Sequence, residues 1–575
     1  RCGNSIDFRL YKYPEEALED LMLYQPQVVL LANYTWNMDL SCLIGRRAKA
    51  LNPSSLVVQG GPNFPLDQEV QHRYLSERPE LDFYLMGEGE FATADLIEDF
   101  LGGDSTVAYL KKHGRLTSCA YMEKGELVVN QTRPRTADLD EIPSPYLAGY
   151  MDKFFDNKIH PLIETNRGCP FTCTFCQQGV SYFTKVRHFS VDRVKEELSY
   201  IANMIKTQSP MIRALTVADP NFGMFERDLT ISAHIGSMQD ESGWPSFIDA
   251  TTGKNVPERV LKAIDLMRGG MTVSNAVQSM DANVLKNIKR SNIKLSAYAK
   301  IQKEIKKKGI QSKADVILAM PGETLDSHLV GFKDLIDAGI QSLKTYQLMM
   351  LMGTELEINA SRNQFGLQSA YRILPRSFGE YKEEKSFEIE EVCIATNTLS
   401  FEDYLKARRF HLVLNVFFNE WTFQEILEYL QCQGISAFEW MKLLNNNLGS
   451  APAEVRSLFD RFTKETKDEL FRSEADARTF YSQPGNFRRL VDGEFGNNLL
   501  FMYWAEGLLR YFDPVVTYAF EQLQMCVSSL KPHSDKTDGT ELAELEKFTR
   551  HRLVLGRALN QDFVPTKGRF SYNFQ

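Results

Sequence analysis

The stretch NRGCPFTCTFCQQG, from Asn166 to Gly179, places three cysteines within eight residues. They are Cys169, Cys173 and Cys176, in a chain that has nine cysteines in total. Four thiolates normally saturate a 4Fe-4S cluster, whereas three leave one iron open for a small ligand. The spacing therefore predicts an iron–sulfur cluster with one open position. A closed zinc site with His188 as fourth ligand is the alternative, but the spacing is unusual for zinc.

The sequence around this loop alternates strands and helices. Six strand candidates lie at residues 161–166, 212–218, 246–250, 271–277, 313–319 and 341–347. Their near-continuous apolar character favours parallel strands covered by helices. Six such units predict a partial α/β barrel rather than the complete eight. Because active groups lie at the carboxyl ends of barrel strands, the position of the cysteine loop, directly after the first strand, agrees with its chemistry.

The first hundred residues show a second alternation, which predicts a parallel, doubly wound Rossmann-like sheet. Its strand candidates at 27–35, 55–62 and 82–86 each end in a polar or glycine-rich turn. Ligands of such sheets lie beyond the carboxyl ends of the strands. A single glycine turn is equally consistent with a tight bend and with a ligand-binding site. Three such turns on one rim favour a ligand.

Composition and charge exclude several classes of protein. The chain of 575 residues is long enough for about three or four domains, and no run approaches the ~18 apolar residues of a membrane span. The net charge is −9, from 66 basic and 75 acidic residues, so no nucleic-acid surface is expected. The other cysteines are scattered singly, which fits a reducing, cytoplasmic setting. The sequence opens on Arg1 rather than Met and shows no signal peptide, so an N-terminal piece is expected to be absent from it.

The cysteine spacing, with Phe175 just before the last cysteine, resembles the signature of the radical S-adenosylmethionine (SAM) enzymes. The resemblance implies that the open iron chelates SAM, and that one electron cleaves SAM to methionine and a 5'-deoxyadenosyl radical. Turns after the second, fourth and fifth strands are similar to the SAM pocket of that family. Besides Phe175, their implied SAM-binding residues are Asp219, Gln278, Ser279 and Pro321. Each turn could also be an ordinary end of a strand.

The N-terminal unit resembles the cobalamin-binding domain that precedes the barrel in one large branch of this family. The stretches NYTWN, VVQGGPNFP and MGEGEFA are similar to its recurring turns. The implied cobalamin-binding residues are Tyr34, Thr35, Asn37, Gln59, Gly60, Gly61, Pro62, Gly87, Glu88 and Gly89. The stretch DSHLVG, residues 326–331, fits a cobalt-ligating motif but lies in the barrel. His328 is therefore predicted to be a helix-surface residue and no cobalt ligand.

The predicted domains are an N-terminally incomplete cobalamin-binding domain (1–105), a proline-interrupted linker (106–158), a partial (β/α)6 radical SAM barrel (159–360) and a mainly α-helical domain (361–575). The last domain resembles no family, and its aromatic stripes at helical spacing predict a core rather than a substrate pocket. A helical cap over the barrel mouth would shield a carbon radical from water.

The family resemblance implies a cobalamin-dependent methyltransferase that acts on an unactivated carbon or phosphorus centre of a small molecule. Its expected partners are that substrate and an external one-electron reductant such as flavodoxin or ferredoxin. Two alternatives stay open: a radical rearrangement, cyclisation or oxidation without methyl transfer, and a non-catalytic protein that carries a cluster or a corrin. The sequence assigns no catalytic acid or base. Fold alone does not decide between these functions.

Overall fold

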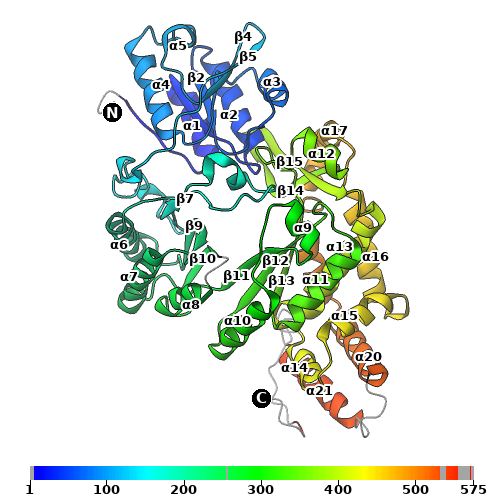
Figure 1. The fold of residues 1–575 in the computed structure, drawn as a ribbon. Helices are drawn as coiled ribbons and strands as arrows, with labels where there is room; N and C mark the ends of the chain where they lie inside the picture. The colour runs from blue at the N-terminus through cyan, green and yellow to red at the C-terminus, as the bar shows by residue number, and fades with distance from the viewer. Residues whose placement is uncertain (1–5, 254–256, 531–538, 554–569, 571–575) are drawn as a thin grey trace.

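A computed structural model of the chain describes residues 6–253, 257–530, 539–553 and 570. Figure 1 shows an N-terminal α/β unit, a second α/β unit below it and a large helical region beside both. A long β-hairpin lies between the N-terminal unit and the helices. None of the helices in these described ranges has the length and apolar character needed to span a membrane.

The N-terminal unit is built on a five-stranded sheet in the order β1-β2-β3-β4-β5. Strands β1 (Val28–Ala32), β2 (Leu56–Gly60) and β3 (Phe83–Leu85) are parallel. The buried run Leu56–Val58 suits a strand covered on both faces. The unit's helices are α1 (Pro14–Tyr24), α2 (Met38–Leu51), α3 (Gln68–Ser76), α4 (Glu90–Gly102) and α5 (Val107–His113).

This sheet extends past residue 105, into the segment predicted as a linker. Strands β4 (Cys119–Glu123) and β5 (Glu126–Val129) form an antiparallel hairpin, and β4 pairs with β3. The sheet is therefore mixed and not wholly parallel. The hairpin turn has positive φ at both central residues, Lys124 (51°) and Gly125 (86°), as a two-residue type I′ turn requires. The single glycine of this turn, Gly125, was the sequence feature that could have predicted the hairpin.

The second unit contains six parallel strands, close to the six predicted places. Strands β6 (Leu162–Ile163), β9 (Ala214–Phe222) and β10 (Phe247–Thr252) form one set, and β11 (Val273–Gln278), β12 (Ser312–Leu318) and β13 (Ser342–Gln347) form the other. A parallel bridge between Ile248 and Met271 joins the two sets, so the strands follow one another in sequence order. The carboxyl ends of all six strands consequently lie on one side.

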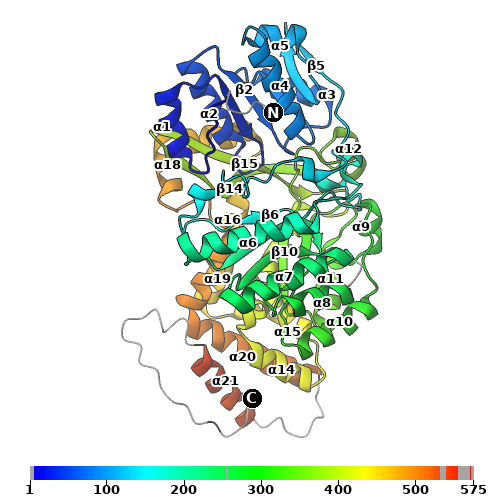
Figure 2. The same ribbon diagram turned by 90° about the vertical axis from the view of Figure 1, so that its left-hand side faces the viewer.

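Helices cover the outer face of this second sheet. They are α6 (Val191–Gln208), α7 (Glu226–Ser242), α8 (Pro257–Leu266), α9 (Ala282–Asn287), α10 (Leu295–Lys307) and α11 (Leu325–Asp337). Figure 2 shows α6, α7 and α8 side by side along the sheet. Their apolar residues form one core with the strands, which includes the fully buried Leu198, Ile231 and Ala263.

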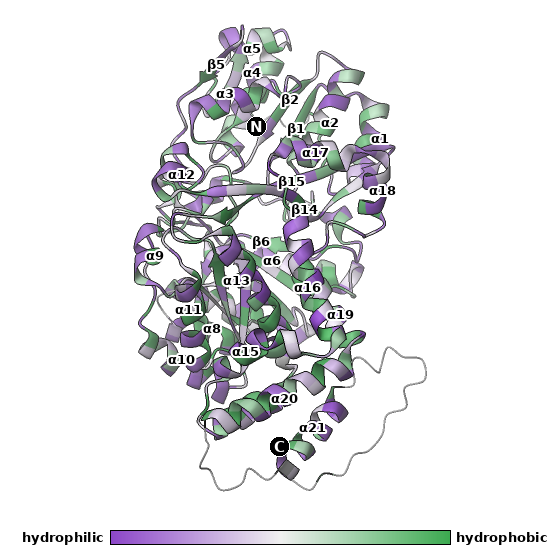
Figure 3. Cartoon of the chain, turned by 90° about the vertical axis from the view of Figure 1, so that its right-hand side faces the viewer, coloured by the Kyte–Doolittle hydropathy of each residue, from purple (hydrophilic) through white to green (hydrophobic). Residues whose placement is uncertain are grey.

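The C-terminal region begins with a structure that its helical prediction did not include. Strands β14 (Gln368–Tyr381) and β15 (Glu384–Ala395) form a long antiparallel hairpin. Strand β15 packs on α2 of the N-terminal unit, and α17 (Glu474–Ser482) and α18 (Pro484–Val491) pack on the hairpin. The hairpin thus joins the first and last thirds of the chain (Figure 3).

The remaining C-terminal elements are helical, and their aromatic residues form a core as predicted. The helices are α12 (Asn359–Phe365), α13 (Phe401–Val413), α14 (Gln424–Cys432), α15 (Ala437–Asn446), α16 (Ala453–Asp468), α19 (Leu499–Leu509), α20 (Phe512–Leu530) and α21 (Gly539–Arg552). Phe417, Trp440 and Tyr518 are fully buried. The same core includes Val316 of β12 and Phe332 of α11. These helices therefore extend the second unit sideways.

Candidate functional site

The three clustered cysteines lie on a loop that follows β7 (Asn166–Arg167), next to the carboxyl end of β6. Cys169 and Cys173 are each 5% exposed, and Cys176 is half-buried. The loop is closed by backbone hydrogen bonds, among them Cys176 N to Cys173 O at 3.1 Å and Gly179 N to Cys176 O at 2.8 Å. A Cβ on Gly179 would lie 2.1 Å from Cys173 O, so the loop requires glycine there.

Polar donors from the end of β9 and from the loop after α9 face the cysteine sulfurs. Asn221 Nδ2 donates to Cys169 Sγ at 3.3 Å, and Arg290 Nη1 donates to Cys173 Sγ at 3.7 Å. Burial lowers the pKa of Arg290, and the charges of all three cysteines oppose that shift. A cation and an amide donor both favour the thiolate form. The donor set therefore fits a group that needs three thiolates.

The zinc alternative finds less support in this geometry. The His188 ring lies against Arg227, with Nδ1 and Nη1 3.3 Å apart, and burial together with Arg227 lowers the His188 pKa. Within the part of the chain that the structure describes, no three His, Cys, Asp or Glu side chains gather closely enough for a single metal ion. Thiolates that bind different irons of one cluster need not gather so closely.

Asp219, a predicted SAM-binding residue, is instead engaged within the protein. Its carboxylate accepts hydrogen bonds from Thr165 N (2.8 Å), Thr165 Oγ1, Asn166 N (3.2 Å) and Asn166 Nδ2 (2.7 Å). Both oxygens are thus satisfied, and burial raises the pKa of Asp219 to about 6. Asp219 anchors the start of the cysteine loop.

Gln278 is the predicted SAM-binding residue that keeps a free acceptor. It has a left-handed φ of 64°, is 9% exposed, and its buried Oε1 has no hydrogen-bond partner within the described residues. The buried Oδ1 of Asn221 is in the same state. Sequence reasoning did not select Asn221, although it stands in the turn predicted after the second barrel strand, ADPNF (218–222).

The other predicted SAM-binding residues make local contacts. Ser279 Oγ accepts from Asp281 N at 3.2 Å, and the Pro321 carbonyl accepts from Asn287 Nδ2 at 3.0 Å. Phe175 packs against a buried cluster that contains Leu318 and Met320. These three residues shape the turns at the strand ends.

The first predicted cobalamin turn follows β1 and carries an exposed aromatic pair. Tyr34 and Trp36 stack with ring centroids 4.6 Å apart, and they are 39% and 59% exposed. Tyr34 N donates to Asn37 Oδ1 at 2.8 Å, which folds the turn back on itself. Thr35 lies between the two rings in sequence and lines a cavity described below.

The second turn, after β2, brings backbone into close contact with backbone. Gly61 has a φ of 140°, and a Cβ there would lie 2.4 Å from Asn33 O. Gln59 does not lie on this rim, contrary to the implied role. Its side chain is fully buried, and its Oε1 accepts from Tyr74 OH at 2.8 Å, because both faces of β2 are covered.

The third turn, after β3, connects the N-terminal unit to the rest of the chain. Glu88 accepts from Arg135 Nε and Thr136 N, both at 2.8 Å, so both carboxylate oxygens are engaged. A Cβ on Gly87 would lie 2.8 Å from the Tyr182 ring. Gly89 precedes α4, and a Cβ there would make only an ordinary contact, 3.9 Å from Thr93 Oγ1. The Glu88 side chain thus links the third turn to Arg135 and Thr136 within the protein.

Residues directly after the cysteines bind the cobalamin turns. Gln177 Nε2 donates to Pro62 O at 3.1 Å and to Met352 O at 2.8 Å. The Glu88 backbone N donates to Tyr182 OH at 3.2 Å. The structure therefore brings the predicted cluster loop and two of the three predicted cobalamin turns into direct contact.

His328 is not a surface residue, so that prediction is wrong. It is 2% exposed on α11, with Nδ1 2.9 Å from Glu323 Oε1 and Nε2 2.8 Å from His411 Nε2. The pair ties α11 to α13. Both ring nitrogens of His328 are engaged within the protein, which agrees with its rejection as a cobalt ligand.

Comparison with known proteins adds three findings. The sequence pattern of the Radical SAM superfamily matches residues 163–336. The chain is 27% identical, over 99% of its length and 82% of the relative's, to the 2-(S-pantetheinyl)-carbapenam-3-carboxylate methyltransferase of Streptantibioticus cattleyicolor. It is 30% identical, over 60% of its length, to the cobalamin-dependent radical SAM methyltransferase TokK of Streptomyces tokunonensis, of which it spans half.

Among solved structures, the chain is similar to the cobalamin-dependent SAM radical enzyme OxsB with aqua-cobalamin and SAM bound. The TM-score is 0.51 at 14% identity, and the match covers 94% of this chain and 77% of OxsB. At this identity the likeness shows a shared fold. It extends over nearly the whole chain, including the C-terminal helices.

Proposed function

The chain belongs to the cobalamin-dependent radical SAM enzymes, and we propose that it is a methyltransferase for an unactivated carbon or phosphorus centre of a small molecule. When bound, a 4Fe-4S cluster with SAM supplies a hydrogen-abstracting radical, and cobalamin carries the methyl group. Cys169, Cys173 and Cys176 would hold the cluster. The turns after β1, β2 and β3 would hold the corrin.

The contact between the cluster loop and the cobalamin turns carries this proposal. Gln177 is the residue after Cys176, and its amide bonds Pro62 of the second turn directly. A radical generator needs no corrin to abstract hydrogen, and a corrin needs no radical to methylate a nucleophile. Holding both groups beside one cavity serves an acceptor that must first become a radical.

The chain's own residues would position these groups. Asp219 fixes the start of the cysteine loop, and Arg290 and Asn221 stabilise thiolates at its centre. Gln278 and Asn221 offer buried oxygens that have no partner among the described residues and that suit donor groups of SAM. The electron would come from an external donor such as flavodoxin or ferredoxin in the cytoplasm.

Product analysis tests the proposal. Anaerobically reconstituted protein with SAM, cobalamin, a reductant and a candidate substrate should form 5'-deoxyadenosine and S-adenosylhomocysteine in roughly equal amounts. Methyl label from SAM should appear in the product. Deoxyadenosine without adenosylhomocysteine would instead favour rearrangement, cyclisation or oxidation. Neither nucleoside, from protein with an intact reduced cluster, would overturn the enzymatic assignment.

A further inference from the structure

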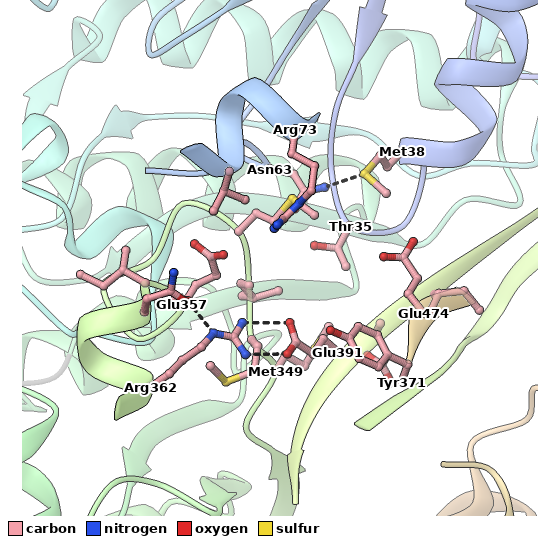
Figure 4. A pocket seen from close by; sticks show the side chains of 18 of the residues that line it. Thr35, Met38, Asn63, Arg73, Met349, Glu357, Arg362, Tyr371, Glu391 and Glu474 are labelled. Atoms are coloured by element: carbon pink, nitrogen blue, oxygen red, sulfur yellow. Dashed lines mark hydrogen bonds and ion pairs between the residues drawn. The ribbon is translucent and has the colours of Figure 1, made fainter. Parts of the chain in front are cut away.

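A cavity of about 340 Å³ lies between the N-terminal unit, α12 and the β14–β15 hairpin. Figure 4 shows its walls, with Thr35 and Arg73 on one side and Glu357, Arg362 and Tyr371 on the other. Four methionines contribute to the apolar lining: Met38, Met349, Met350 and Met352. Methionine side chains adapt to irregular partners, so this lining suits a flexible chain.

The cavity adjoins the proposed reaction site on two sides. Thr35 belongs to the first cobalamin turn, and the Met352 carbonyl accepts a hydrogen bond from Gln177 of the cluster loop at 2.8 Å. A ligand in the cavity would therefore reach both the corrin turns and the cysteine loop without leaving the protein.

Most charged groups of the cavity are already paired. Arg362 binds Glu391 through two contacts of 2.6 and 2.9 Å, Arg372 binds Glu390 at 2.6 Å, and an arginine of α17 binds Glu474 at 2.6 Å. These pairs leave no free charge for a ligand.

Glu357 and Arg73 differ from these pairs. Glu357 Oε2 is buried without a hydrogen-bond partner in the described residues, and burial raises the pKa of this carboxyl. Arg73 is an exposed residue whose guanidinium makes no hydrogen bond or ion pair within those residues, although its charge acts on Glu357, and Figure 4 shows it pointing into the cavity. A buried acceptor without a donor costs free energy that a ligand's N–H would recover.

We propose that this cavity binds an uncharged, carboxamide-bearing chain, whose N–H donates to Glu357 and whose C=O accepts from Arg73. A carboxamide presents a donor and an acceptor in one rigid unit. An anion is disfavoured because, among the described lining residues, two carboxyl groups without an ion pair, Glu69 and Glu357, stand against the single unpaired cation Arg73. The amide has two possible sources, an amide arm of the substrate or an amide side chain of the corrin; the first rests on the proposed function.

Binding measurements distinguish these sources without requiring turnover. Holoprotein is titrated with pantetheine, an uncharged chain with two amides, and with pantothenate, which has one of these amides and a carboxylate. Cobalamin-free protein with an intact cluster is titrated with hydroxocobalamin. Variants Arg73→Met and Glu357→Met remove the two groups, and Arg73→Lys retains the charge. Arg488→Met, at an exposed side chain of α18, and Glu402→Met, in the first turn of α13, are the matched controls.

A substrate arm predicts that pantetheine binds more tightly than pantothenate. Both Met variants should then weaken pantetheine by tenfold or more, Arg73→Lys should recover part of the loss, and hydroxocobalamin affinity should stay within twofold. A corrin amide predicts instead a tenfold loss of hydroxocobalamin affinity in both Met variants. Unchanged affinities for all three compounds, in variants with full iron content, would overturn the proposal. Methylation with no amide binding would do so too, while amide binding without methylation would contradict only the proposed function.

Discussion

The cysteine loop and the cobalamin turns lie in contact, yet they use different parts of the chain. In the loop, side-chain sulfurs are the ligands, and Asn221 and Arg290 donate to them. In the turns, Gln59 and Glu88 direct their side chains into the protein, and glycine backbone forms the rim. The first region is defined by chemical groups and the second by the space that missing side chains leave. Substitutions should therefore separate them.

Removal of the thiolates should have the largest effect. Protein with Cys169, Cys173 and Cys176 replaced by Ala should lose about four irons and four sulfides per chain, since these are the three cysteines that the loop carries. Hydroxocobalamin binding should remain. Iron and sulfide analysis after anaerobic reconstitution checks the loss, and Cys432→Ala, at an exposed cysteine, is the control. Retained iron–sulfur absorption, or stoichiometric zinc in the native protein, would contradict the cluster.

A side chain at Gly61 should give the opposite result. Gly61→Val places a Cβ 2.4 Å from Asn33 O in a left-handed conformation, so the second turn must move. We expect hydroxocobalamin affinity to fall more than tenfold while iron content stays at the native level. Gly102→Ala, which meets open space in the same unit, should change neither value. Parallel loss of iron and cobalamin would show that the two regions fold as one.

Protonation of Asp219, which anchors the cysteine loop, should change the free energy of unfolding. Because burial raises its folded-state pKa to about 6 from 3.8, the folded chain keeps a proton that the unfolded chain has released. The free energy of unfolding is thus highest below about pH 4 and falls by roughly 3 kcal/mol as pH rises through 6. Urea unfolding of the metal-free chain between pH 4 and 7 measures this. Asp219→Asn should reduce the change of the free energy of unfolding with pH over this range. An unchanged pH dependence would show that Asp219 is not the group responsible.

Loss of the Gln177 amide should have the smallest effect. It tests whether the cysteine loop and the cobalamin turns are coupled through this side chain. Gln177→Ala removes two hydrogen bonds, worth about 1 kcal/mol each, between the loop, the second cobalamin turn and Met352. Cobalamin affinity should fall severalfold at unchanged iron content. Gln424→Ala is the control, because the Gln424 amide bonds only Glu428, at 2.9 Å between exposed side chains of α14, among the described residues. Equal effects of both variants would remove Gln177 as the link.

The sequence was most informative where a residue pattern has a single structural interpretation. Three cysteines at a fixed spacing predicted the loop, and apolar runs predicted all six strands of the second sheet. Rim residues were harder, because a polar residue beside a glycine turn can face a ligand or the protein. Glu88 and Gln59 face the protein. His328 was misplaced because its partner, His411, is 83 residues away.

The β14–β15 hairpin was missed for a local reason. Its turn residues, Lys382 and Glu383, have φ of 51° and 67°, the type I′ conformation that asparagine and glycine usually mark. Pro375 and the charges of the two strands also hide the alternation of the hairpin. Its position is fixed by distant contacts, such as those of β15 with α2. Such contacts leave no pattern in neighbouring residues.

The N-terminal unit is completed only after several hundred further residues have been translated. Asn37 makes no side-chain cap at the start of α2, and Glu388 instead accepts from Asp39 N at 2.9 Å and Leu40 N at 3.1 Å. Glu388 follows Asp39 by 349 residues, a delay of roughly 20 to 70 s on the ribosome. Arg478, which binds Asp39 at 2.8 Å, comes later still. The nascent N-terminal unit must therefore stay soluble with one helix end uncapped and one face uncovered.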